Sequence, residues 1–157
     1  DEVWIPDYEK APGFAGDLSH PHRLPINARY IGPLSRFEVP LVKKPIKWDA
    51  IAIISGPEPQ RSLFEAELTR RFIESGKPAL IVQGKPDEPR DQQIDNLRVV
   101  NHLDDTKVLE ELAQAEKVIS RSGYSSIMDY HVLEIEAELH PTPGQTEQEF
   151  LAQLHGS

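Results

Sequence analysis

Hydrophobic positions divide the chain into two parts that differ in texture. Over residues 1–46, short apolar pieces such as Val3-Trp4-Ile5 and Tyr30-Ile31 are separated by repeated prolines. Proline has no amide hydrogen and discourages a regular helix, although short strands fit between prolines. We therefore predict a proline-rich connector with short strands over residues 1–46 and a folded domain over residues 47–157.

From Trp48 onward, apolar runs alternate with amphipathic segments, a texture typical of α/β proteins. The run 50–54 is continuous, as expected for a strand that is covered on both faces. Segment 61–75 repeats its apolar residues near the helical period and stops at Gly76. The predicted elements are strands at 50–54, 79–82, 97–100, 117–120 and 135–139, and helices at 61–75, 106–115 (capped by Thr106), from about 122–125, and 145–154. This order predicts a Rossmann-like parallel sheet with helices on both faces and with 135–139 at its border.

Composition narrows the classes of partner. The formal net charge of -9 argues against a nucleic-acid polymer, because phosphate backbones are bound by clustered Lys and Arg. One nucleotide is not excluded, since a diphosphate can be held by a few backbone amides at a helix N-terminus. No apolar run approaches the roughly 18 residues of a membrane span, and the absence of cysteine fits a reducing compartment. We therefore expect a cytoplasmic protein without a membrane span.

Three loops lie where open parallel sheets gather their ligands, at the carboxyl ends of strands. They span residues 55–60, 121–126 and 141–148. In the second loop, Gly123 lets the backbone approach a ligand, and the amides that follow begin a helix whose positive end attracts phosphate. Asp129 lies six residues later, where a carboxylate can accept hydrogen bonds from ribose hydroxyls. The alternative is that Ser122 merely caps the helix and Asp129 is solvated.

The third loop is rich in amide and carboxylate groups after a Pro-Gly turn. Gln145, Glu147 and Gln148 suit the vicinal hydroxyls of a sugar, which present paired donors and acceptors. The alternative is an ordinary polar helix start, in which the helix dipole favours Glu147 and Glu149.

The first loop has few main-chain donors for a phosphate, and the histidines do not form a recognisable metal-binding motif. Pro57 and Pro59 have no amide hydrogen, so Ser55, Gly56 and the residues after Pro59 are the donors left in that loop. The six His residues show no metal-ligand spacing, and neither a G-x-S-x-G motif nor a P-loop is present. We therefore expect no metal and no cofactor.

Two motifs follow one another in a specific order. Residues 121–129 are R-S-G-Y-S-S-I-M-D, and residues 141–149 are P-T-P-G-Q-T-E-Q-E. With the order of strands and helices and with Y-I-G-P-L at 30–34, they resemble glycosyltransferase family 28. This family includes the UDP-N-acetylglucosamine transferase of peptidoglycan synthesis, and the resemblance spans nearly the whole chain.

The resemblance implies a GT-B architecture, in which two Rossmann-like domains face a cleft and this chain is the C-terminal domain. The implied function is donor binding in a hexosyltransferase that moves a hexosyl or N-acetylhexosaminyl group from a UDP-sugar to an acceptor. An N-terminal domain that binds the acceptor and supplies the catalytic base is expected in addition, with any peripheral membrane contact left to it. We therefore expect no catalytic residue within this chain, which the resemblance implies is truncated at both ends.

Carried over by position, the resemblance also implies a nucleotide-sugar site. Its diphosphate end is expected at Ser122 and Gly123, its ribose at Asp129, and its base near the backbone of His102 and Leu103. The donor sugar is expected at the third loop. The complete set of implied binding residues is Ser55, Gly56, His102, Leu103, Arg121, Ser122, Gly123, Ser125, Asp129, Thr142, Gly144, Gln145, Glu147 and Gln148.

Two other functions are also compatible with the sequence. One is a non-catalytic nucleotide-sugar-binding module that folds alone, which the reading frame before Asp1 distinguishes from an enzyme. The other is a sugar-nucleotide epimerase with the same two-domain plan, which would use carboxylates across the cleft. Product analysis separates an epimerase from a transferase.

Overall fold

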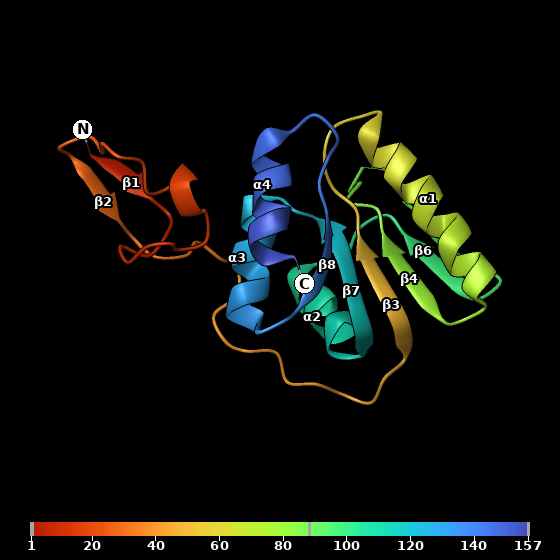
Figure 1. The fold of residues 1–157 in the computed structure, drawn as a ribbon. Coiled ribbons are helices and arrows are strands. Elements are labelled where there is room, and N and C mark those ends of the chain that lie inside the picture. Colours follow the sequence, from red (N-terminus) through yellow and green to blue (C-terminus); the bar gives the residue numbers. More distant parts are fainter. Residues whose placement is uncertain (1, 88, 157) are drawn as a thin grey trace.

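The centre of the protein is a six-stranded, mainly parallel sheet. A computed structural model describes residues 2–87 and 89–156 of the chain (Figure 1). The sheet contains β3 (Trp48–Ile53), β4 (Ala79–Val82), β5 (Asp91–Ile94), β6 (Leu97–Val100), β7 (Ala115–Arg121) and β8 (Ala137–His140), in the order β5-β6-β4-β3-β7-β8. Neighbouring strands are parallel except for β5, which pairs antiparallel with β6. The predicted α/β class with a mainly parallel sheet flanked by helices is confirmed.

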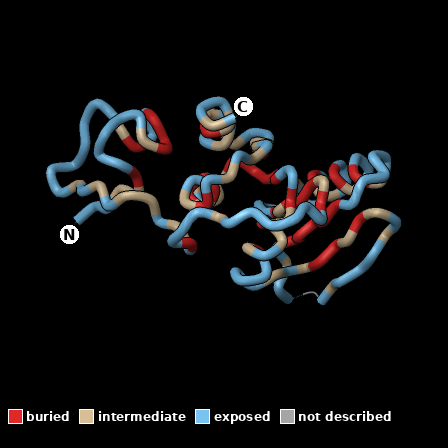
Figure 2. The backbone as a smooth tube through the Cα atoms, turned by 90° about the horizontal axis from the view of Figure 1, so that it is seen from below, coloured by how far each residue is buried: buried red, intermediate tan, exposed pale blue. Residues whose placement is uncertain are grey.

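Helices cover both faces of the sheet, because its strands carry apolar side chains on both. They are α1 (Gln60–Ser75), α2 (Asp105–Ala113), α3 (Tyr124–Leu133) and α4 (Thr146–His155). One core contains Phe64 and Leu68 of α1, and the opposite core contains Leu112 of α2 and Tyr130 of α3. Figure 2 shows how the buried positions concentrate in these strands and helices. Within the described ranges, no helix is long and apolar enough to cross a membrane.

Within residues 47–157, the predicted elements agree with the observed ones in type and order and their bounds agree to within two residues, apart from two differences. β5 was not predicted, because its side chains are polar and largely exposed and it is held by pairing with β6. The helix α2 is capped by Asp104 rather than by Thr106, since the Asp104 carboxylate accepts a hydrogen bond of 2.9 Å from the amide of Lys107. Both differences depend on contacts that a local pattern of apolar residues does not encode.

A small lobe precedes the sheet. It contains the parallel strands β1 (Val3–Ile5) and β2 (Ala28–Tyr30) and a short 3-10 helix, η1 (Gly16–Leu18). The carboxylate of Asp7 is fully buried and accepts hydrogen bonds from the amides of Phe14 and Ala15, at 2.8 and 3.0 Å, and from the Ser19 hydroxyl, at 2.6 Å. The lobe is therefore organised around one buried anion rather than around an apolar core.

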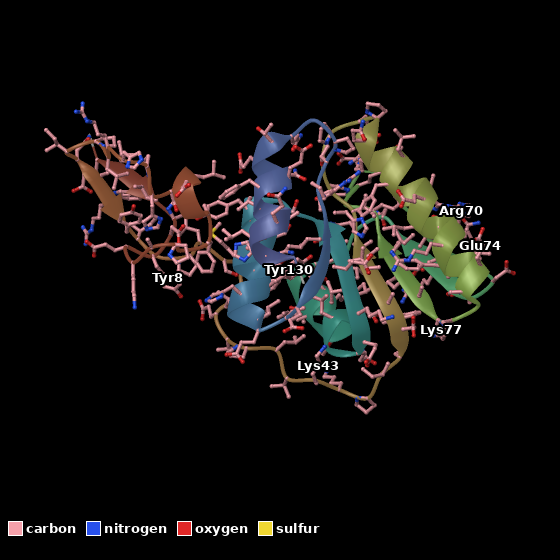
Figure 3. The ribbon with its side chains drawn as sticks, viewed as in Figure 1. Tyr8, Lys43, Arg70, Glu74, Lys77 and Tyr130 are labelled. Carbon is pink, nitrogen blue, oxygen red and sulfur yellow. The ribbon has the colours of Figure 1, made fainter. Side chains whose placement is uncertain are left out.

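The lobe and the segment that follows it are attached to the sheet domain. The Tyr124 hydroxyl donates a hydrogen bond of 2.7 Å to the carbonyl of Pro6, and the Tyr8 hydroxyl lies 3.4 Å from Nε2 of His131. Lys43, labelled in Figure 3 with Tyr8, reaches the carbonyl of Ala115 at the start of β7. These contacts hold residues from the first third of the chain against α3 and the sheet.

Candidate functional site

The strand order places a topological switch point between β3 and β7. From β3 the chain continues through β4 to β6 on one side, whereas β7 and β8 lie on the other side. Ile53 is aligned with Ser120, and Arg121 with His140, so β3, β7 and β8 end at the same edge. In open α/β sheets, ligands bind in the crevice outside the carboxyl ends of the strands at such a point.

Arg121 holds the loops around this edge together. Its guanidinium donates hydrogen bonds of 2.8 Å to the carbonyl of Pro141 and of 3.0 Å to the carbonyl of Gln60. It also lies over the ring of Phe64, with 4.0 Å between Cζ and the ring centroid. Burial lowers the pKa of this side chain, which is 6 % exposed. Arg121 thus positions the loops after β7 and β8 and the start of α1. The guanidinium nitrogens Nη1 and Nη2 bind protein carbonyls rather than a ligand.

A second set of hydrogen bonds joins the predicted second and third loops. The Ser122 hydroxyl donates 2.7 Å to the carbonyl of Gln148. The side-chain amide of Gln148 accepts from the amide of Thr142, at 2.9 Å, and donates to the side-chain oxygen of Gln145, at 2.7 Å. Ser122 and Gln148 therefore fix the shape of the site, and the idea that Ser122 merely caps α3 is wrong, because the N-cap is Gly123.

A groove of about 440 Å³ opens between these two loops, a volume in the range of small-molecule sites. Its walls are formed by Gly123, Tyr124, Gly144, Gln145, Thr146, Glu147 and Gln148. The helices α3 and α4 both begin at this groove, and neither receives a cap from a described side chain. The first amides of a helix have no partner within the helix and carry its positive dipole end. The groove therefore offers two sets of main-chain donors.

Gly123 occupies the mouth of the groove in an ordinary backbone conformation. Its φ of -71° and ψ of 143° are accessible to any residue. A Cβ atom built on it would lie 3.9 Å from the Ser126 hydroxyl oxygen, which is a normal contact. The backbone conformation at position 123 therefore does not require glycine. Gly144, with a φ of +81°, is required by the turn itself.

Asp129 lies away from the walls of the groove and is held by the connector. Its carboxylate accepts 2.7 Å from the Ser35 hydroxyl and 3.1 Å from Nε of Arg36. Arg36 also forms an ion pair of 2.8 Å with Asp105 at the start of α2. The alternative of a solvated Asp129 is therefore wrong, and a ribose at this position would share the carboxylate with Arg36.

The remaining predicted residues lie along the same edge. Ser55 and Gly56 are exposed after β3, and a Cβ atom on Gly56 would lie 3.9 Å from the Thr142 hydroxyl oxygen. That hydroxyl is buried and has no partner among the described residues. Ser125 is exposed in the first turn of α3.

The two residues expected near the base follow β6 rather than β7. His102 is exposed, and Leu103 packs against the core beneath α2 and α3. β4 and β3 separate their strand from β7, so they occupy the same edge at a distance from the groove. Ion pairs of Arg36 with Asp105 and with Asp129 connect the start of α2, which follows their loop, to α3.

Tyr124 also lines the groove, although the sequence motifs do not single it out. Burial first, and then the negative charges of Asp7 and Glu147, raises the pKa of its hydroxyl, so it stays protonated and donates to Pro6. Its only signal in the sequence was its place beside Gly123, since one aromatic residue in a helix start has no distinctive pattern.

Hollows also lie elsewhere on the described residues, including one of about 480 Å³ along α1 that is lined by Ser62, Arg70, Gln83 and Arg90 among others. Two hollows of about 230 and 750 Å³ beneath the lobe share Phe14, His131 and His155, and residues of the loops 55–60, 121–126 and 141–148 do not line them. In the described part of the chain, no group of three acidic or His side chains is arranged to hold a metal ion. Comparison of the chain with protein-family models, with curated proteins and with solved structures found no match.

Proposed function

We propose that the chain is the donor-binding domain of a glycosyltransferase of GT-B architecture and that it holds a UDP-sugar in the groove between the starts of α3 and α4. The observation that carries the proposal is the meeting of two helix N-termini without side-chain caps beside Gly123, at the switch point of the sheet. This arrangement suits a diphosphate, which main-chain amides can bind without a cationic side chain. The resemblance of the two loop motifs to glycosyltransferase family 28 supports the same function.

The two sides of the groove suggest different roles. The Gly123 side offers backbone without a Cβ atom and the amides that begin α3, which favours the diphosphate. The other side carries the carboxylate of Glu147 and the amide of Gln145, which favours sugar hydroxyls. Because the Glu147 carboxylate would repel phosphate, we orient the donor with its sugar toward α4 and its diphosphate toward α3.

Departure of the nucleotide is the step that this site would assist. When the bond between sugar and diphosphate breaks, negative charge develops on the leaving oxygen, and helix N-termini at that position stabilise it. The titratable side chains among the groove residues are Tyr124 and Glu147, and Tyr124 is kept protonated. Glu147 is already assigned to the donor sugar, so we assign the catalytic base to a further domain facing this edge, as the resemblance implies.

Calorimetric titration with UDP, UDP-N-acetylglucosamine and ADP tests the proposal. We expect the isolated chain to bind UDP and the UDP-sugar weakly and to leave the sugar bond intact. The control is Gly123→Val, whose new side chain would fill the approach to the α3 amides. Absence of UDP binding, or equal affinity of the Gly123→Val variant, contradicts the proposal.

Product analysis separates transfer from other chemistry at the same site. We expect neither transfer nor epimerisation when the chain is incubated with UDP-N-acetylglucosamine and simple alcohols. Sugar transfer by the chain alone contradicts the need for a second domain, and an inverted sugar in the recovered nucleotide favours an epimerase.

A further inference from the structure

A second hollow, of about 360 Å³, continues from the groove toward the lobe. Its walls include Trp4 and Leu18 of the lobe together with Tyr124 and Glu147. Tyr124 and Glu147 also line the groove, so the two spaces adjoin one another at these side chains. Glu147 is on the side of the groove that we assign to the donor sugar, so a molecule that contacts Glu147 from the hollow would lie beside that sugar.

The hollow combines an aromatic surface with a carboxylate. Trp4 is 66 % exposed and Leu18 is 52 % exposed, so both present apolar surface to a molecule in the hollow. Glu147 is an exposed residue that also lines the hollow, and its carboxylate can accept hydrogen bonds from hydroxyl groups. A pyranose ring fits this pair, because its C–H groups form an apolar face while its hydroxyls project around the edge.

Tyr124, which lines both the groove and the hollow, is held by a hydrogen bond to the lobe. The hydroxyl of Tyr124 donates a hydrogen bond of 2.7 Å to the carbonyl of Pro6, directly after β1. Pro6 is followed by Asp7, whose buried carboxylate organises the lobe. Trp4 is thereby held near the start of α3 by the same short segment that contacts Tyr124.

We propose that this hollow is an acceptor subsite for a sugar ring, which stacks on Trp4 and donates hydroxyl hydrogen bonds to Glu147. The inference rests on the proposed function, because it makes the acceptor of the transfer a carbohydrate. Its position next to the donor sugar is the geometry that transfer between two sugars requires. The lobe then contributes to acceptor recognition, together with the further domain.

Trp4 supplies its own reporter for a test. The chain has two tryptophans, and Trp48 is 6 % exposed, so acrylamide quenches mainly the fluorescence of Trp4. The chain is first titrated with UDP and then, with UDP present, with methyl β-glucopyranoside and the methyl glycoside of N-acetylglucosamine. Glycerol supplies hydroxyls without a ring, and cyclohexanol supplies an apolar ring with one hydroxyl. We expect the methyl glycosides to protect Trp4 from quenching and the two alcohols to leave it accessible.

Variants assign the binding to this surface. Saturation-transfer NMR of the glycoside is expected to show affinity reduced about three- to tenfold in Trp4→Ala, the loss expected for one aromatic contact. Val3→Ala is the matched control, because Val3 is a half-exposed neighbour in β1 that does not line the hollow. Glu147→Gln is expected to weaken the glycoside while UDP binding is retained.

The outcomes distinguish this proposal from the one on which it rests. If UDP binds but no glycoside protects Trp4, the acceptor subsite is wrong and the donor site stands. If glycosides protect Trp4 but UDP does not bind, the donor site is wrong and the role as an acceptor subsite fails with it. Equal protection by cyclohexanol overturns recognition of a sugar ring.

Discussion

The hydroxyl of Ser122, fully buried at the end of β7, donates a hydrogen bond of 2.7 Å to the main-chain carbonyl of Gln148 in α4. These residues are 26 positions apart, and the bond joins the loop that begins α3 to the first turns of α4. The groove exists because this bond and the side-chain amide of Gln148 keep the two helix starts beside one another.

Replacement of Ser122 by Ala tests the contribution of this bond to the fold. We expect the free energy of unfolding to fall by about 1 kcal/mol, because the half-buried carbonyl of Gln148 loses its side-chain donor. Urea denaturation measures the change. Ser125→Ala is the control, since Ser125 is exposed at the same helix start, and it should change stability by less than about 0.5 kcal/mol. Equal stability of the two variants would show that the bond is not needed to hold the loops.

Replacement of Gly123 separates ligand approach from folding. Because φ is -71° and the nearest atom to a new Cβ is 3.9 Å away, Gly123→Val should remain folded while its nucleotide affinity falls. Gly144→Ala should instead lower the stability of the fold, since a left-handed φ costs about 1–2 kcal/mol in any residue with a Cβ atom. Thermal unfolding and UDP titration of both variants measure the two effects. A folded Gly123→Val protein with unchanged affinity would remove this loop from the site.

Replacement of Arg121 by Lys tests the clamp around the switch point. Lysine keeps the charge but lacks the planar fork that reaches both Gln60 and Pro141, so we expect a loss of about 2 kcal/mol in unfolding free energy. UDP-sugar affinity should also fall, because loops held by this side chain form the site. Arg70→Lys is the matched control on the exposed surface of α1. Loss of ligand affinity with full stability would instead indicate that Arg121 contacts the ligand.

Gln148 is not a clean test of sugar binding, because its side chain already forms hydrogen bonds with Thr142 and Gln145. Gln148→Ala removes the bond to the Thr142 amide, so it should lower stability as well as UDP-sugar affinity. Glu147→Gln leaves that network intact and should weaken a UDP-sugar by about 1 kcal/mol while UDP alone is nearly unaffected. Equal losses for UDP and the UDP-sugar in the Glu147 variant would contradict a role in binding the sugar.

Asp129 is tested through its partner Arg36. If the carboxylate binds ribose, Asp129→Ala should weaken UDP and UDP-sugar equally, because both contain ribose. Arg36→Ala should cost at most about 1 kcal/mol of stability, as expected for half-exposed ion pairs, and should leave UDP affinity unchanged or higher. Reduced UDP affinity in both variants would indicate that the ion pair shapes the site and that Asp129 does not bind ribose directly.

Asp7 makes the stability of the lobe dependent on pH. Burial by itself raises the pKa of Asp7, but hydrogen bonds from Ser19 and from the amides of Phe14, Ala15 and Tyr8 outweigh it, so the folded pKa lies below the ordinary value of 3.8. The contribution is present above pH 3.8 and is lost as the pH falls through the lower folded value.

Acid denaturation of Asp7→Asn measures this contribution. At pH 7 we expect Asp7→Asn to lose about 2 kcal/mol, since hydrogen bonds to a buried charge are removed. Below pH 3.8 the difference from the original chain should shrink. Asp17→Asn in η1, which is exposed, is the control for the removal of a carboxylate from the lobe. A constant difference between Asp7→Asn and the original chain would contradict the lowered pKa.

Much of the sheet could be predicted from the sequence because its strands are buried on both faces. Residues 79–82 and 97–100 were predicted with their observed bounds, since such strands are continuous apolar runs. The convergence of residues 121–126 and 141–148 also followed, because the carboxyl ends of parallel strands share one edge. β5 could not be predicted, because a polar edge strand is specified by its partner β6 rather than by its own pattern.

The roles of individual polar side chains were decided by the tertiary structure. The guanidinium of Arg121 reaches the carbonyl of Gln60, 61 positions away, and the carboxylate of Asp129 reaches Arg36, 93 positions away. A sequence pattern shows which residue types are near one another along the chain. Nearly every residue has a main-chain amide and carbonyl, however, so the sequence does not identify which main-chain group a side chain will bind. The sequence by itself therefore determined the parallel sheet and the edge at which the loops of the proposed site meet. Only the packing of distant loops decided that Arg121, Ser122 and Asp129 hold protein groups, because the partner of each is brought to it by the fold.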